Sequence, residues 1–120
     1  MSASFPALDE ATFDAAVLAR PGVSVVDFWS VSCVPCRQMT RVLQELAREV
    51  PASVLIAQVD TDAYPGLAER FGVRALPTLL FFKDGRLAET RTGIDRRQVL
   101  KKAIVALVAP DGGAAAASES

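Results

Sequence analysis

Cys33 and Cys36 are the only cysteines in this chain of 120 residues, and Val34 and Pro35 separate them. Two thiols this close can form half of a metal site, a reversible dithiol, or a pair of small apolar core side chains. A structural zinc site needs four ligands, whereas this chain has no histidine and no second cysteine pair, so we expect no metal site. The lack of histidine also excludes a Cys–His nucleophile of the protease kind. The spacing therefore favours a dithiol, with inert packing as the alternative.

The cysteine pair is predicted to lie between a strand over residues 23–28 and an amphipathic helix that ends before Pro51. The helix is indicated by apolar residues at three- and four-residue spacings, namely Met39, Val42, Leu43, Leu46, Ala47 and Val50. Free N–H groups and the helix dipole stabilise a thiolate at such a helix start. Cys36 is in phase with the apolar face, whereas Cys33 precedes the first turn and is expected to be exposed. We therefore expect Cys33 to attack and Cys36 to resolve.

Periodicity and turn residues predict an α/β fold that contains a mixed sheet with helices on both faces. Further helices are expected over residues 8–19, from Asp62 through Phe71 with a stop at Gly72, and from Asp95 through about residue 108, where Gln98 completes a capping box. Further strands are expected over residues 54–59, 78–83 and 86–92, the last two joined by an Asp84–Gly85 hairpin turn. Residues 1–109 are predicted to form one domain, and residues 110–120 a low-complexity tail.

The charge balance gives no reason to expect a nucleic-acid or membrane partner. The chain has 13 basic and 14 acidic residues and a net charge of −1. Its first residues do not read as a secretory signal, and no apolar run approaches the ~20 residues of a membrane span. These features predict a cytoplasmic protein, where a structural disulfide does not persist.

Three stretches of the sequence resemble thioredoxin: VVDFWSVSCVPCRQM, FGVRALPTLLFFKDG and TGIDRR. The resemblance covers residues about 8–108. It implies a thioredoxin fold and a protein-disulfide reductase that works by dithiol–disulfide exchange through Cys33 and Cys36. It also implies disulfide-containing client proteins and no bound cofactor, with recycling by a thioredoxin-reductase-like flavoprotein that uses NADPH. We also expect a monomer. A redox-switched binding module and a partner dedicated to one client are the alternative functions.

By the same resemblance, Asp27 is the buried aspartate beneath the cysteines, with a raised pKa and a proton relay to or from Cys36. The alternative for Asp27 is a place in water at a strand end. Substrate contacts are implied for residues around the pair: Trp29, Val34, Pro35, Leu76, Pro77 and Gly93. Pro77 matches the cis-proline of the family, and Leu76 offers its backbone to an extended substrate. Trp29 could instead be plain core, and Gly93 could simply be a bulge or turn glycine.

Four positions depart from the family pattern. Val34 replaces a glycine, Ser32 replaces an aromatic residue, and Arg41 replaces a proline that usually kinks the helix. Gln58 replaces a lysine, so that Asp27 lacks a cationic neighbour. These departures leave the redox prediction intact and bear on the reduction potential, the proton relay and the choice of clients.

Overall fold

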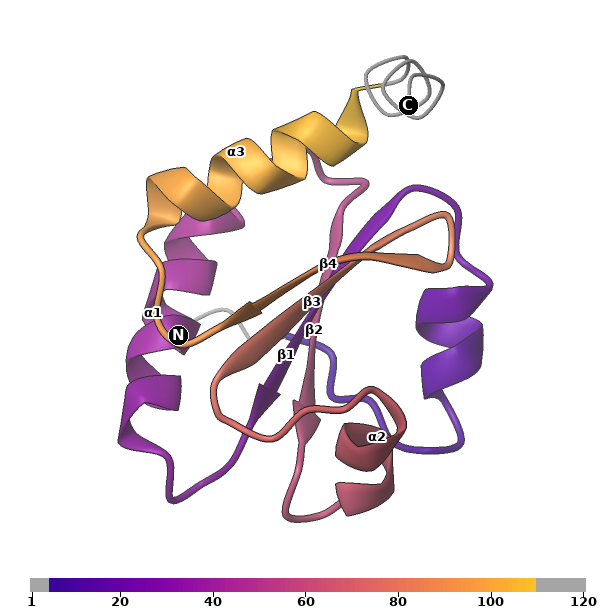
Figure 1. The fold of residues 1–120 in the computed structure, drawn as a ribbon. Helices are drawn as coiled ribbons and strands as arrows, with labels where there is room; N and C mark the ends of the chain where they lie inside the picture. Colours follow the sequence, from indigo (N-terminus) through magenta and orange to yellow (C-terminus); the bar gives the residue numbers. More distant parts are fainter. Residues whose placement is uncertain (1–4, 110–120) are drawn as a thin grey trace.

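The computed structural model describes residues 5–109, which form a four-stranded sheet with helices on both faces (Figure 1). In chain order the elements are a short π-helical segment η1 (Asp14–Leu18), β1 (Val23–Trp29), α1 (Val34–Leu46), β2 (Leu55–Asp60), α2 (Pro65–Arg70), β3 (Thr78–Lys83), β4 (Arg86–Thr92) and α3 (Arg97–Val108). The predicted tail over residues 110–120 lies outside the described residues.

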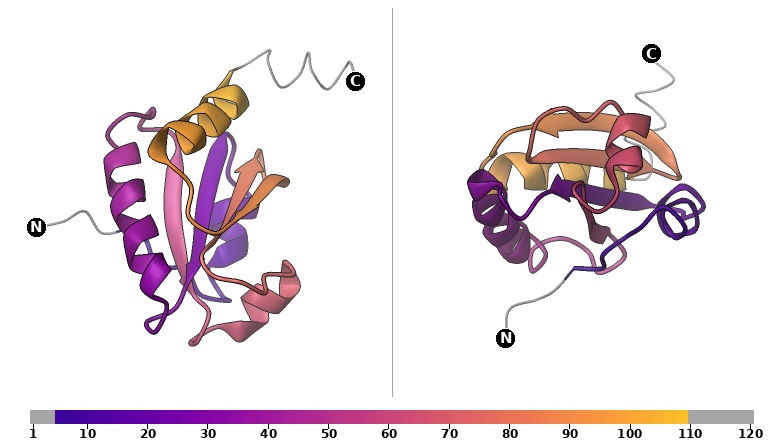
Figure 2. Two further views of the ribbon diagram at one scale, coloured as in Figure 1. Left: turned by 60° about the vertical axis from the view of Figure 1, so that its left-hand side comes forward. Right: turned by 90° about the horizontal axis from the view of Figure 1, so that it is seen from below.

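The sheet is mixed, as predicted, with strand order β2-β1-β3-β4. β1 and β2 are parallel and joined through α1, whereas β3 pairs antiparallel with both β1 and β4. Side chains alternate between the two faces of β1. Val23 and Val25 pack with α1 and α3, while Val26 and Phe28 pack with η1 and α2. Helices α1 and α3 therefore cover one face and η1 and α2 the other (Figure 2).

The hairpin between β3 and β4 is confirmed at the predicted residues. Asp84 and Gly85 both have positive φ, 52° and 82°. A Cβ on Gly85 would lie 2.0 Å from the carbonyl oxygen of Leu18, so the close approach of η1 requires glycine here. The Asp84 carboxylate also accepts the Gly22 N–H at 2.7 Å, which ties this turn to the start of β1.

The predicted helix over residues 8–19 is wrong for half of its length. Leu8 donates its N–H to the Gln58 carbonyl, and Gln58 donates its N–H to the Pro6 carbonyl, both at 2.9 Å. The segment therefore pairs with the edge of β2, whose backbone groups need partners. Helical geometry is confined to residues 13–18. The helix-like spacing of Leu8, Phe13 and Val17 reflects burial in one cluster and not one continuous helix.

Two predicted helix starts are also wrong. Asp62 does not cap α2, which begins at Pro65. Instead, the backbone N–H of Asp62 donates to the Asp60 carboxylate at 2.9 Å. Asp95 does not cap α3, because its carboxylate accepts from the guanidinium of Arg91 at 2.8 Å. In both cases a residue two to four positions earlier in the chain provides the partner, so another local hydrogen bond replaces the expected cap.

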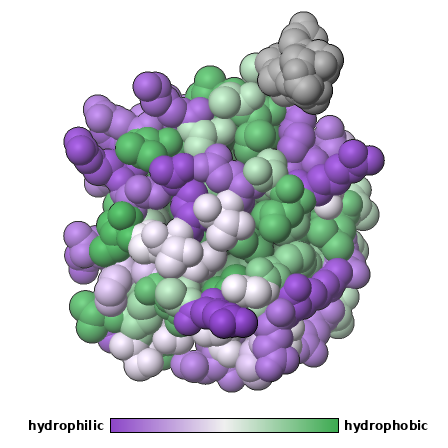
Figure 3. Space-filling view, in the orientation of Figure 1, coloured by the Kyte–Doolittle hydropathy of each residue, from purple (hydrophilic) through white to green (hydrophobic). Residues whose placement is uncertain are grey.

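The helix after the cysteines ends at Leu46, four residues earlier than predicted. Beyond it Arg48 and Glu49 donate to the carbonyls three residues before them, at 3.1 and 2.9 Å, so the helix closes in tighter turns. Within residues 5–109 no helix is long and apolar enough to cross a membrane. Hydrophobic and hydrophilic residues are interspersed over the face drawn in Figure 3.

Candidate active site

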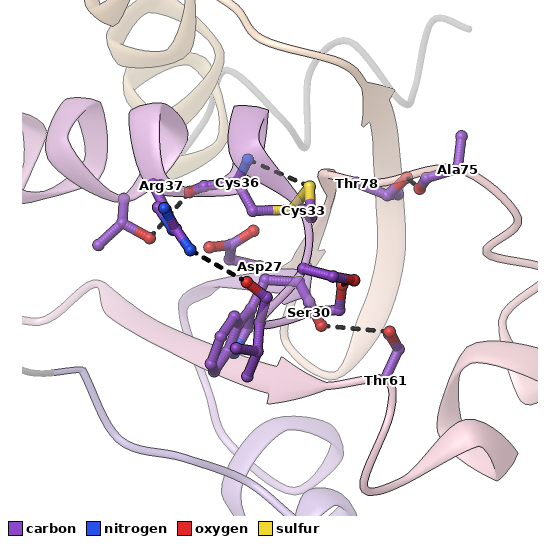
Figure 4. The surroundings of a disulfide bond; sticks show 12 residues. Asp27, Ser30, Cys33, Cys36, Arg37, Thr61, Ala75 and Thr78 are labelled. Atoms are coloured by element: carbon purple, nitrogen blue, oxygen red, sulfur yellow. Dashed lines mark hydrogen bonds between the residues drawn. A yellow bond between two sulfur atoms is a disulfide. The ribbon is translucent and has the colours of Figure 1, made fainter.

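The two cysteines form a disulfide at the start of α1 (Figure 4). Cys33 is the N-cap residue, in extended backbone conformation, and its Cα lies 5.3 Å from that of Cys36. The Cys36 N–H is shared between the sulfur and the carbonyl oxygen of Cys33, each at 3.2 Å, so one donor of the helix start points at this sulfur. Pro35 in the first turn has no N–H to leave unpaired.

The two sulfur-bearing residues differ in exposure. Cys36 is 1% exposed and shares the buried face of α1 with Met39 and Leu43, as its helical phase predicts. Cys33 is half-buried, which is less open than the expected exposed position. Its neighbours Val31 and Val34 are 62% and 68% exposed, so the accessible side of the pair has an apolar rim.

Asp27 is completely buried, and the alternative that places it in water is wrong. Strand alternation turns it to the α1 face with Val25, and Figure 4 draws its carboxyl beneath the disulfide. Burial raises the pKa of Asp27 to about 6, although a hydrogen bond from the Gln58 amide, 3.1 Å from Oδ2, acts to lower it. The other oxygen, Oδ1, is buried without a hydrogen-bond partner among the described residues.

Gln58 reaches Asp27 because the two residues are direct partners in the parallel pair of β1 and β2. Its amide nitrogen also donates to the Thr40 hydroxyl at 3.2 Å, and that hydroxyl donates to the Cys36 carbonyl at 3.1 Å. Sequence reasoning missed Thr40. Its position four residues after Cys36, on the same helix face, was the signal that could have found it.

The loop before β3 contributes the other predicted rim residues. The Leu76–Pro77 bond is cis, as the resemblance implies, and Pro77 is buried. Gly93 has φ +91° and donates its N–H to the Pro77 carbonyl at 2.8 Å, so these two residues are brought together. Ala75, in the same loop, is among the residues drawn around the disulfide (Figure 4). Figure 4 thus draws part of this loop in the surroundings of the disulfide.

Trp29 and Cys36 line the same pocket. This pocket has a volume of about 470 Å³. The other lining residues are Arg37, Thr40, Arg41, Gln44 and Gln58. The Trp29 carbonyl accepts the N–H and the hydroxyl of Thr61, at 2.9 and 3.2 Å, which fixes the end of β1. Two of its lining residues, Arg37 and Arg41, are exposed, so the pocket leads from the surface toward the buried Cys36.

Among residues 5–109 no three acidic or cysteine side chains come together in a way that could hold a metal ion. The groups placed for chemistry at this site are the dithiol and the carboxyl beneath it. A dithiol of which one sulfur is reachable and the other shielded can open and close by exchange with a partner disulfide.

Comparisons with known proteins agree with this chemistry. The family model described as thioredoxin matches residues 4–106. The thioredoxin of Rhodospirillum rubrum is 41% identical over 86 residues, which cover 72% of this chain and 83% of the relative. Thioredoxin 1 of Synechococcus elongatus is 39% identical over 87 residues, 72% of this chain and 81% of that protein. The thioredoxin of Chlamydia muridarum is 45% identical over 83 residues, 69% and 80% of the two chains. The chain therefore belongs to the thioredoxin family, and its Cys33–Cys36 pair makes it a thiol–disulfide oxidoreductase of that family.

Proposed function

We propose that this protein reduces disulfide bonds of client proteins, with Cys33 as the attacking cysteine and Cys36 as the resolving one. The observation that carries the proposal is the unequal burial of the two sulfur-bearing residues at the start of α1. Cys33 is half-buried beside exposed valines, whereas Cys36 is 1% exposed. Only Cys33 is then open to a folded client.

The exchange proceeds in two displacements. The Cys33 thiolate attacks one sulfur of the client disulfide, forms a mixed disulfide, and expels the other client sulfur as a thiolate. Cys36 then loses its proton and attacks the Cys33 sulfur, which forms the intramolecular disulfide and releases the second client thiolate. The client gains two electrons and the protein loses two. The Cys33–Cys36 disulfide seen in the structure is the product state of this sequence.

Asp27 serves as the acid–base group of the second displacement. A buried carboxyl whose pKa is raised to about 6 accepts and returns a proton close to neutral pH. It lies beneath the disulfide, on the side of the shielded Cys36 (Figure 4). Asp27 would thus take the Cys36 proton as that sulfur becomes a nucleophile.

Clients dock on the rim around Cys33, which comprises Val34, Pro35, Leu76, Pro77 and Gly93. Exposed Val34 supplies apolar contact area. The backbone of Leu76, for which no hydrogen bond is found within the described chain, pairs with an extended client segment. Trp29, which lines the pocket beside Cys36, is a further residue that clients would contact.

The oxidised protein is recycled by a flavoprotein of the thioredoxin-reductase type that draws on NADPH, and the chain itself binds no cofactor. We further propose that it works as a cytoplasmic monomer in electron transport and redox homeostasis. The balance of 13 basic and 14 acidic residues supports protein clients over nucleic acid.

Insulin reduction tests the proposed function. With dithiothreitol as the electron source, catalytic amounts of the protein are expected to precipitate the insulin B chain well before the uncatalysed control. With a bacterial thioredoxin reductase and NADPH in place of dithiothreitol, oxidation of NADPH should accompany insulin reduction. Cys33→Ser protein is the matched control and should behave like buffer. Precipitation at the uncatalysed rate by the intact protein would contradict the proposal.

Alkylation tests the assignment of the two cysteines. In the folded, reduced protein near neutral pH, iodoacetamide is expected to label Cys33 at least about tenfold faster than Cys36. The thiolate of Cys33 is stabilised by the helix start, and Cys36 is shielded. Peptide mapping by mass spectrometry measures the ratio. Label found mainly on Cys36 would reverse the assignment.

A further inference from the structure

The hydrogen bonds behind the dithiol have a fixed direction. The Gln58 amide nitrogen carries two hydrogens, and both are used, toward Asp27 Oδ2 at 3.1 Å and Thr40 Oγ1 at 3.2 Å. The Thr40 hydroxyl has one hydrogen, which goes to the Cys36 carbonyl at 3.1 Å. Since that hydrogen is committed, Thr40 can only accept from Gln58.

This direction makes the two oxygens of Asp27 different. Oδ2 is held as an acceptor by the Gln58 amide, so a proton on Oδ2 would face an N–H group. Oδ1 is buried and has no partner among the residues of the described chain. A proton taken up by Asp27 is therefore carried on Oδ1.

We propose that Thr40 and Gln58 are positioning residues for the exchange reaction, which together hold Asp27 Oδ2 as an acceptor and leave Oδ1 to exchange the proton with Cys36. The inference rests on the proposed acid–base role of Asp27. In the second displacement the Cys36 proton moves to Oδ1, the Cys36 sulfur bonds to the Cys33 sulfur, and the client sulfur leaves with the electron pair of the broken bond.

Thr40 also connects this network to the backbone of the resolving cysteine. Its bond to the Cys36 carbonyl spans one helical turn and ties the backbone of the resolving cysteine to the carboxyl through a single amide. These hydrogen bonds therefore fix the position of the Asp27 carboxyl relative to the first turn of α1. Loss of the Thr40 hydroxyl would free one hydrogen of Gln58 and one lone pair of the Cys36 carbonyl.

Few charged groups face this network. From α1 the titratable or charged residues that share the pocket are Cys36, Arg37 and Arg41. The β-strand partners of Asp27 are Gln58 and Leu79, which do not titrate. From α3, Leu100 and Ile104 pack in the core on this face of the sheet. A change in the pH dependence of the second displacement can therefore be traced to Asp27 or to Cys36 itself.

The two displacements can be timed separately with 5,5′-dithiobis(2-nitrobenzoate). Attack by Cys33 of the reduced protein releases one coloured thiolate, and attack by Cys36 on the mixed disulfide releases a second. Stopped-flow absorbance over pH 5–9 gives both rates. We expect Thr40→Val, which keeps the side-chain shape, to slow the second release about three- to tenfold, as loss of one hydrogen bond predicts. The first release should stay within twofold of the intact protein. The midpoint of the second phase should move to higher pH, because the carboxyl loses its aligned donor.

Thr40→Ser keeps the hydroxyl and should restore the second release to within twofold, which a purely packing role of Thr40 would not predict. Gln58→Met, which keeps length and lacks donors, should slow the second release at least as much as Thr40→Val. Thermal unfolding of each variant shows that it is folded. In the intact protein, the Gln58 side-chain amide resonances should titrate with the Asp27 carboxyl carbon and share its midpoint.

Asp27→Asn separates failure of this inference from failure of the proposed function. If Asp27→Asn slows the second release and neither Thr40→Val nor Gln58→Met does, the positioning role is overturned and the role of Asp27 stands. If Asp27→Asn leaves the second release unchanged, the acid–base role falls and the positioning role with it. Gln58 amide resonances that ignore the Asp27 titration would also overturn the inference.

Discussion

Immobilised Cys36→Ser protein is expected to retain several client proteins from a cell extract, and dithiothreitol should elute them. In the intact protein, Cys36 lies one helical turn from Cys33 and resolves the mixed disulfide within the molecule. Its effective concentration is on the order of mM or far higher, well above that of an unlinked thiol. Without the second sulfur, Cys33 still attacks, but no nearby group releases the client. Insulin reduction driven by reductase and NADPH should fall by about 10³-fold or more.

The matched control for the trap is a double variant that lacks both sulfurs, Cys33→Ser with Cys36→Ser. It should retain none of the proteins that the single variant holds. Gel electrophoresis with and without reductant, followed by mass spectrometry of the eluate, makes the comparison. Partners that survive reductant, or that bind equally well without Cys33, would instead indicate a module that binds clients without exchanging electrons with them.

Asp27→Asn is expected to stabilise the protein above about pH 6 and to slow its reaction. The carboxyl has a pKa of 3.8 in its ordinary environment and about 6 in the fold, where burial raises it. The folded protein therefore binds this proton more tightly than the unfolded chain, so stability falls as the pH rises from about 4 to 6. At neutral pH the ionised carboxyl costs about 3 kcal/mol.

Asparagine removes that cost and still accepts the Gln58 hydrogen bond, but it places an amide donor where Oδ1 has no partner. We therefore expect a net gain of about 1–3 kcal/mol in the free energy of unfolding at pH 7–8. No gain is expected below pH 4, where the aspartate is neutral in both states. Urea unfolding at several pH values measures this difference. An equal effect of Asp27→Asn at pH 3.5 and pH 8 would mean that ionisation of Asp27 is not its cause.

The same variant should reduce insulin at least about tenfold more slowly, since a positioned acid–base group contributes about 10²–10⁴-fold. The defect should be largest above neutral pH, where formation of the Cys33 thiolate no longer limits the rate. Infrared or NMR titration of the intact protein locates the ionisation of Asp27 directly. A midpoint near pH 4 would remove the physical basis of both expectations.

Much of the site could be predicted from local sequence. Two cysteines at the start of an amphipathic helix, with Cys36 in its apolar phase, define which sulfur is shielded, because helical phase is a local property. The strands β1, β3 and β4 and the Asp84–Gly85 turn also follow from short-range patterns, and all lie where those patterns predict, apart from one extra residue in β1. The burial of Asp27 was implied by the resemblance to thioredoxin, because local sequence alone left a place in water at the strand end open.

Other features depended on contacts between distant residues, and only the tertiary structure decided them. Residues 6–8 pair with β2 because its edge exposes backbone groups, and this choice overrides a helix-like pattern. The Asp84 carboxylate accepts the N–H of Gly22, which lies 62 residues away in the chain, because the hairpin turn packs beside the start of β1. One hydrogen-bond network links Asp27, Gln58, Thr40 and Cys36. It forms because of the register between β1 and β2 and because of the way α1 packs over the sheet. Hydrogen-bond partners are chosen by distance in space, and sequence patterns record only distance along the chain.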